Sequence, residues 1–350
     1  MRKRWNLENA DRKTVYEVSL AAIILLAILI GIVYWVGQTL EEDRQTVEAR
    51  GDLSERFAEV PAVEYNGALY RPYENLTSIL MIGVDRYSTA EDTGLSYRNG
   101  GQADYLLLLV INDDTGTVTP IQIDRDTMTE ITILGVLGDN TGTRMTQICL
   151  SHGFGDGKEL SCRLTEEAVS GLLQGIGIDF YIAMDIDGIS TLNDALGGIT
   201  VTLEDDFSAL DPAMVSGATL TLEGVQAEYY VRGRMYIGVG TNEARMVRQR
   251  TFMDALSQRV YERIHDNGSA DFVGDLLDSL DPYLLTDMAR GRIINEAWNT
   301  RDFDRLDTVQ PEGRFVIGEY GFNEFHADEA SLEAIVMNTF YYPVETEPES

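Results

Sequence analysis

Short apolar runs separated by polar turns predict the strands of a buried sheet. Residues 79–85 and 105–111 are apolar along almost their whole length, as expected of central strands covered on both faces. A polar turn at 112–116 joins the second run to residues 117–124, whose alternating pattern predicts its hairpin partner. The same pattern predicts two further strands, at 180–186 and 199–203.

Segments with apolar residues at helical spacing alternate with these strands. They predict helices at 164–175, 188–196, 222–231, 242–264, 283–298 and 328–338. Strands that alternate with helices indicate the α/β class. We expect one three-layer α/β/α domain with a mixed central sheet over residues 75–343, followed by a disordered acidic tail at 344–350.

The longest apolar run predicts a transmembrane helix at residues 17–40. No charged residue lies between Glu17 and Glu41, and the run is long enough to cross a hydrocarbon core of about 30 Å. A cleaved signal peptide is the alternative, but the run is long for one and no small-residue cleavage site follows it.

The charges that flank this run predict its orientation. Basic residues precede it and acidic residues follow it, so the positive-inside rule places residues 1–16 in the cytoplasm. We therefore expect a single-pass membrane protein, with an extracytoplasmic stalk at 41–74 and an extracytoplasmic domain beyond it.

The overall charge excludes one class of partner. Lys and Arg number 27 against 58 Asp and Glu, which gives a formal net charge of -31. Nucleic-acid binding through phosphate neutralisation needs clustered Lys and Arg, so we expect no nucleic-acid partner. An acidic chain is compatible with divalent cations, and any cluster of arginines in it is informative.

The two cysteines, Cys149 and Cys162, lie in the part of the chain expected outside the cytoplasm. An oxidising compartment permits a disulfide that closes a short loop, and we favour it over two buried free thiols.

Acidic residues stand at the ends of the predicted strands. Asp85 ends the first strand, Asp104 precedes the second, and Asp126 follows the third. If the first and third strands are parallel and the second antiparallel, these residues meet at one edge, where ligands collect in α/β sheets. Converging carboxylates repel one another unless a cation or an arginine lies between them, and Mg²⁺ suits such a site. The alternative is that each Asp caps a turn.

The charged stretch Asp124-Arg125-Asp126 ends the third strand. Because neighbours on a strand point to opposite faces, we expect Asp124 to point away from the site. Arg125 would then point into the site, toward a phosphate if the site binds one, and Asp126 would hold Arg125 or an acceptor.

Four arginines flank a glycine-rich stretch: Arg232, Arg234, Arg245 and Arg248. The last two share one face in the first turns of the predicted helix 242–264. Their charge opposes the helix dipole there, and a phosphate bridging several arginines would offset that cost. A solvated basic face paired with surface Glu is the alternative.

In this order, the segments resemble the LytR-CpsA-Psr family of bacterial cell-wall glycopolymer transferases. The resemblance covers roughly residues 75–343. The segments that carry it are ILMIGVDR (79–86), the strand start at Asp104, IDRDT (123–127) and the R-x-R…R-x-x-RQ run (232–249). It implies a membrane-anchored α/β/α domain that moves a glycan with its phosphate from a polyprenyl-pyrophosphate carrier to a hydroxyl of peptidoglycan. The implied chemistry is a phosphoryl transfer assisted by Mg²⁺ or Mn²⁺.

The resemblance also implies roles for individual residues. Asp85 and Asp104 correspond to metal-holding carboxylates, and Asp126, Arg125 and Asn242 are the candidate catalytic residues. The lipid tail is expected in an apolar tunnel. The positions implied to bind pyrophosphate are Arg86, Gln102, Arg125, Arg232, Arg234, Arg245 and Arg248.

Two positions depart from the family pattern. Gln102 stands where the family usually has an arginine, and Asn242 stands where an acidic residue is expected. Asn242 cannot act as a base, so the base is Asp126 or none is needed in a loose phosphoryl-transfer transition state. Two other hypotheses stay open: a non-catalytic protein that binds the lipid-linked glycan, and a polyprenyl-pyrophosphate hydrolase.

Overall fold

The computed structural model describes residues 62–85, 101–135, 138–233, 237–238, 242–267 and 270–344. The chain divides into two units, Met1–Asp52 and Leu53–Ser350, and all described residues belong to the second. The transmembrane helix predicted at 17–40 lies outside the described residues. Within the described ranges, no helix is both long and apolar enough to cross a membrane.

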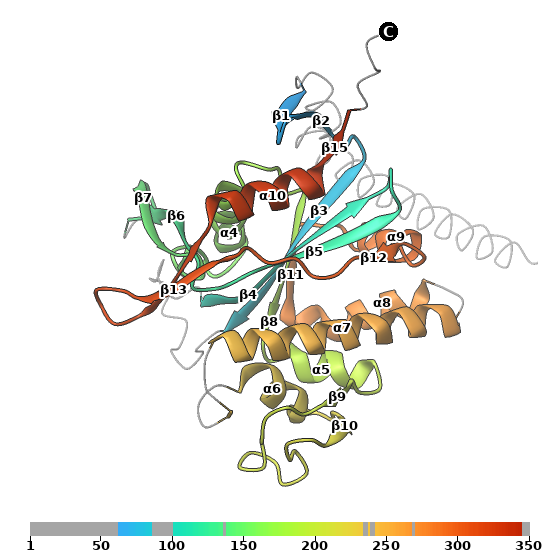
Figure 1. Cartoon of the computed structure of the whole chain (residues 1–350). Helices are drawn as coiled ribbons and strands as arrows, with labels where there is room; N and C mark the ends of the chain where they lie inside the picture. Colours follow the sequence, from blue (N-terminus) through green and yellow to red (C-terminus); the bar gives the residue numbers. More distant parts are fainter. Residues whose placement is uncertain are drawn as a thin grey trace, which may run out of the picture. The chain divides into compact units, whose positions relative to one another are not determined.

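A six-stranded mixed sheet forms the centre of the second unit, as predicted (Figure 1). Its order is β11 (Leu284–Thr286), β8 (Phe180–Asp185), β3 (Leu76–Asp85), β4 (Gln102–Asn112), β5 (Thr117–Ile123) and β12 (Asp304–Arg305). The strand β4 is antiparallel to both β3 and β5, so β3 and β5 run in the same direction. The ends of β3 and β5 and the start of β4 therefore lie at one edge of the sheet.

Helices cover both faces of this sheet. On one face, α4 (Glu159–Leu172) and α10 (Glu329–Phe340) pack on the sheet in a core that includes Leu80, Val169 and Val336. The helices on the opposite side are α5 (Gly188–Ala195), α6 (Val225–Arg232), α7 (Asn242–Asn267), α8 (Asp271–Leu280) and α9 (Arg290–Asn299) (Figure 1). They enclose a second core that contains Tyr230 and Phe252.

Two helix predictions need correction. The helix predicted at 164–175 begins at Glu159 and ends at Leu172. Its first turn buries Ser161 and Cys162, which give no strong apolar signal in the sequence. The helix predicted at 283–298 is shorter and begins at Arg290. The preceding residues form η2 (Asp281–Tyr283), with Pro282 in its first turn, and then strand β11. Proline lacks the N–H that an interior helix position donates.

Smaller strand pairs complete the unit. Two strands within the range predicted as stalk, β1 (Val63–Tyr65) and β2 (Ala68–Pro72), form a sheet with β15 (Tyr341–Pro343). The pair β9 (Thr200–Thr202) and β10 (Thr219–Thr221) lies beside α7. Two hairpins complete the inventory: β6 (Met128–Leu134) with β7 (Asn140–Gln147), preceding α3 (Leu150–Gly153), and β13 (Gly313–Ile317) with β14 (Asn323–Ala327).

Candidate functional site

A β-bulge on β4 positions Asp104. Gly83 pairs with Tyr105 and Val84 pairs with Ala103, so Asp104 is an extra residue with none directly opposite on β3. A bulge changes the direction of a side chain without breaking the sheet. A Cβ on Gly83 would lie 2.8 Å from the Cβ of Tyr105, so the close approach of the two strands requires glycine here. An isolated glycine in an apolar strand was the signal in the sequence for this bulge.

The turn that follows β5 presents Arg125 to Asp104. Asp124 caps the turn, because its Oδ1 accepts the N–H of Asp126 at 2.7 Å. Arg125 donates through Nη1 to Asp104 and through Nη2 to Gln102, and its Nε lies 3.5 Å from Oδ1 of Asp126. Asp124 therefore caps the turn, and Arg125 contacts three of the predicted site residues.

Two arginines from the helical side reach the same edge. Arg232, at the end of α6, donates to Oδ1 of Asp85 at 2.9 Å and to Glu228 at 2.8 Å. Nη1 of Arg245, in the first turn of α7, lies 3.7 Å from Oδ2 of Asp104. The structure thus brings Asp85, Asp104, Arg232 and Arg245 together with Arg125.

Arg248 lies away from this cluster. It donates from Nη1 to Asp205 at 2.6 Å, from Nε to the carbonyl of Tyr230 at 3.3 Å, and from Nη2 to the carbonyl of Gly233. Its guanidinium also lies 5.6 Å from the ring centroid of Phe207. The two arginines differ because residue 205 and the end of α6 lie against Arg248, whereas Arg245 reaches Asp104 on β4. The described contacts of Arg248 hold the end of α6 to α7 and do not include the carboxylates of the cluster.

Three predicted site residues are not placed by the structure. Arg86 and Arg234 lie outside the described residues. Asn242 is described only as the first residue of α7, and its side chain lies outside the description.

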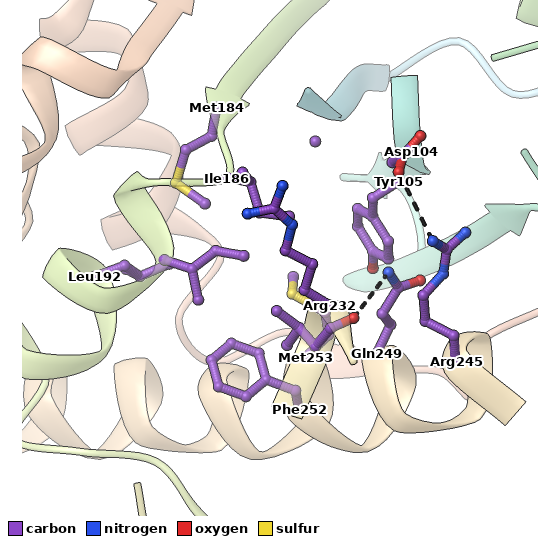
Figure 2. Close-up of a pocket in the computed structure, with 13 residues that line it drawn as sticks. Asp104, Tyr105, Met184, Ile186, Leu192, Arg232, Arg245, Gln249, Phe252 and Met253 are labelled. Atoms are coloured by element: carbon purple, nitrogen blue, oxygen red, sulfur yellow. Dashed lines mark hydrogen bonds and ion pairs between the residues drawn. The ribbon is translucent and has the colours of Figure 1, made fainter. Parts of the chain in front are cut away.

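An apolar pocket of about 90 Å³ adjoins the cluster (Figure 2). Asp104, Arg232, Arg245 and Gln249 form its polar part. Its apolar lining comes from β8, the turn that follows it, α5, α6 and α7: Met184, Ile186, Ile189, Leu192, Val231, Phe252 and Met253. Gln249 and Tyr105 also line it and were not among the predicted site residues. The pocket therefore joins an apolar surface to several cationic and carboxylate groups.

The carboxylates at the edge are electrostatically coupled. Burial raises the pKa of Asp104, the positive charges of Arg125 and Arg245 lower it, and the negative charge of Asp85 raises it again. The repulsion from Asp85 is the feature that a bound cation would relieve. Among the described residues, no group of three or more Asp, Glu, His or Cys side chains could hold a metal. A metal here would need ligands from a substrate in addition to Asp85 and Asp104.

The predicted disulfide is wrong. Cys149 and Cys162 are both free and buried. The Sγ of Cys149 accepts an N–H of Arg125 at 3.3 Å, and Sγ of Cys162 lies 4.0 Å from Nε2 of His152. Burial raises the pKa of Cys149 to about 11, so this thiol stays protonated at neutral pH. Spacing in the sequence permitted a bridge, but the direction of the two side chains depends on tertiary packing.

The raised pKa of Asp104 predicts a pH dependence. Any activity that needs its carboxylate should fall as the pH drops through this pKa, which lies above the ordinary 3.8. For stability the sign is opposite: the native state binds the proton more tightly, so this contribution is present at low pH and is lost as pH rises through the raised pKa. Replacing Arg245 by Gln removes a charge that lowers the pKa, so the acidic limb of kcat/KM should move to higher pH.

The control for this measurement is Arg259→Gln. Arg259 lies on the same helix and pairs with Glu262 at 3.2 Å, away from the cluster. It should leave the acidic limb in place. An unshifted limb in the Arg245→Gln variant would show that Asp104 does not control the pH profile.

The fold and the site define an α/β protein with a carboxylate–arginine cluster at one edge of a mixed sheet and an apolar pocket beside it. The chain belongs to the LytR_cpsA_psr family, whose model matches residues 38–339.

Relatives and a solved structure agree with this assignment. The chain is 28% identical over 258 residues to the cell wall biosynthesis protein LcpA of Corynebacterium glutamicum, covering 66% of this chain and 47% of LcpA. It is 29% identical over 211 residues to the polyisoprenyl-teichoic acid–peptidoglycan teichoic acid transferase TagU of Halalkalibacterium halodurans, covering 60% of each chain. The crystal structure of Bacillus subtilis TagV is similar in fold, with a TM-score of 0.57 and 23% identity over 75% of this chain and 95% of TagV. The chain thus spans about half of LcpA and 60% of TagU.

Proposed function

We propose that the protein is a membrane-anchored phosphotransferase that moves a glycopolymer with its phosphate from a polyprenyl-pyrophosphate carrier to a hydroxyl of peptidoglycan. One observation carries the proposal: the apolar pocket ends at the cluster of Asp104, Arg232 and Arg245. A polyprenyl pyrophosphate has the same division into an apolar chain and an anionic head. The similarity to TagU, a polyisoprenyl-teichoic acid–peptidoglycan teichoic acid transferase, supports the same type of transfer.

The arginines would bind the pyrophosphate by exchanging partners. Arg232 is 39% exposed in its side chain, and its present acceptors are the carboxylates of Asp85 and Glu228. Arg245 is buried and lies 3.7 Å from Asp104, a separation longer than a hydrogen bond. Phosphoryl transfer depends mainly on positioning and on stabilising charge at the phosphate oxygens. Guanidinium groups fixed around one small site can hold the phosphate in position and stabilise the negative charge on its oxygens.

Asp85 and Asp104 fit a Mg²⁺ or Mn²⁺ ion as a pair. Their repulsion favours a cation, and Mg²⁺ is commonly held by one or two carboxylates together with substrate phosphates. When bound, the ion would neutralise charge on the pyrophosphate. The residues of the chain would orient that group against the arginines.

Asp126 is the proposed acceptor of the proton from the attacking hydroxyl. It is buried beside Arg125, and its Oδ1 accepts the Nε2 group of Gln147 at 3.3 Å. A loose transition state places little demand on the strength of a base. Asn242 would then have a positioning role.

The test uses the full chain in detergent micelles, with Mg²⁺, a polyprenyl-pyrophosphate-linked glycan and purified peptidoglycan. We expect a phosphodiester-linked product and equimolar release of the polyprenyl monophosphate. The Asn242→Asp variant, which restores the acidic residue of the family pattern, serves as a comparison. If that variant forms the product and the natural protein does not, the natural protein is not the proposed transferase.

The same assay separates the two other hypotheses. A hydrolase would cleave the carrier in the absence of peptidoglycan. A binding protein would retain the lipid tightly and leave it unchanged when peptidoglycan is added.

A further inference from the structure

The hairpin of β13 and β14 carries an exposed apolar tip, and its base lies beside the candidate site. In Figure 1 this hairpin extends away from α10 and the central sheet. Ile317 is 70% exposed, Tyr320 77% and Phe322 67%. Single exposed apolar residues are ordinary, but adjacent ones gathered at a tip mark an interaction site.

The base of this hairpin is fixed to the turn that holds Arg125. The N–H of Phe325 donates to the carbonyl of Asp126 at 2.8 Å. Gln147, at the end of β7, donates through Nε2 to the carbonyl of Asn323 at 2.6 Å and to the carboxylate of Asp126 at 3.3 Å. The hairpin is therefore continuous with the wall of the site, through residues that do not line the apolar pocket.

The tip is held in a closed turn. The N–H of Gly318 donates to the carbonyl of Phe322 at 2.8 Å, and the N–H of Gly321 donates to the carbonyl of Gly318 at 2.9 Å. Gly321 has a φ of 79°, a conformation that favours glycine. A turn fixed in this way presents its aromatic rings without a large ordering cost on binding.

We infer that this tip binds the acceptor polysaccharide, with Tyr320 and Phe322 stacking against the apolar C–H faces of its sugar rings; the inference rests on the proposed function. In the proposed function the pocket beside Asp104 takes the apolar part of the carrier next to the pyrophosphate, so the acceptor must reach the cluster from another side. The hairpin meets the cluster at Asp126, the proposed acceptor of the hydroxyl proton. A polysaccharide chain bound at the tip would place its hydroxyl groups near Asp126.

The charge of the hairpin favours a saccharide over a lipid surface. Residues 313–327 contain one arginine and two glutamates, Glu319 and Glu324. Anionic bilayers attract clustered Lys and Arg, which this hairpin lacks. The aromatic rings can stack on the apolar face of a sugar ring. The neighbouring carboxylate and amide groups can accept or donate hydrogen bonds with the hydroxyl groups around that ring.

The test measures sedimentation of the full chain, in detergent micelles, with insoluble peptidoglycan stripped of attached polymers. Two double variants are compared: Tyr320→Ala with Phe322→Ala, and Tyr320→Leu with Phe322→Leu. The second keeps apolar side chains and removes the rings. Both should raise the Kd for peptidoglycan about tenfold, because each loses two stacking contacts. Tyr261→Leu, at a 46% exposed position on α7, is the matched control and should bind as the wild type does.

The outcomes are separable. Unchanged binding in both double variants overturns the inference. Wild-type binding by the leucine variant, with loss in the alanine variant, also overturns it, because the contact is then simply apolar. Binding of the polyprenyl-pyrophosphate glycan should be the same in all variants. If the wild type transfers no glycan but ring removal still weakens peptidoglycan binding, the proposed function fails and the binding surface stands.

Discussion

Replacing Asp104 by Asn should reduce glycan transfer by about 10²–10³-fold, the range seen when one preorganised charge-stabilising group is removed from an active site. Asn keeps the shape of the side chain but lacks the charge that faces Arg125 and Arg245. It is also a poor ligand for the proposed Mg²⁺. The rate of phosphodiester formation, measured at saturating carrier, gives the effect directly.

Two measurements make the Asp104 result specific. Asp211→Asn removes a partly exposed carboxylate that bonds to Ala213 and Gln226 rather than to the cluster, and it should leave the rate unchanged. The thermal midpoint of the Asp104→Asn variant should stay near that of the wild type, because loss of the charge also removes its burial cost. A folded Asp104→Asn variant with full transfer activity would remove Asp104 from the site.

Replacing Arg248 by Ala should lower the free energy of unfolding by about 3–5 kcal/mol, as expected when one partner of a buried ion pair is removed. Arg248 is 3% exposed, and its loss leaves the carboxylate of Asp205 and the carbonyls of Tyr230 and Gly233 without their donor. It also removes the contact of the guanidinium with the Phe207 ring. Denaturant unfolding followed by circular dichroism measures the loss.

The comparison for Arg248 is Arg259→Ala on the same helix. Arg259 pairs with the exposed carboxylate of Glu262, and such pairs contribute about 0–1 kcal/mol. It also donates from Nε to the carbonyl of Leu196 at 3.0 Å, so its loss should have a measurable cost that stays below that of losing Arg248. If Arg248→Ala unfolds as the wild type does but binds the polyprenyl-pyrophosphate carrier poorly, Arg248 is a pyrophosphate ligand, as the sequence predicted. The structure favours the stabilising role.

The strands around the site could be predicted because their signals are local. Apolar runs at 79–85 and 105–111 fit central strands, and the turn at 112–116 sets the direction of the next strand. Once those directions are known, Asp85 and Asp104 must share an edge. The prediction that carboxylates and arginines meet there therefore needed only strand direction and residue type.

Local patterns were insufficient where contacts between residues distant in sequence decide what a side chain touches. The arginine run predicted one shared role for Arg245 and Arg248, but what each contacts depends on which elements pack against α7. The spacing of the two cysteines permitted a disulfide. In the folded protein Cys149 contacts Arg125 instead, and this contact could not be predicted from the spacing.

The sequence by itself determined the α/β class, the mixed sheet and the edge where Asp85, Asp104 and Arg125 converge. These follow from periodicity and turn chemistry, which act over a few residues. Only the tertiary structure decided the bulge that directs Asp104, the pocket between the sheet and α5–α7, and the attachment of the β13–β14 hairpin to Asp126. Each of these depends on the register or packing of segments far apart in the chain, which no local pattern encodes.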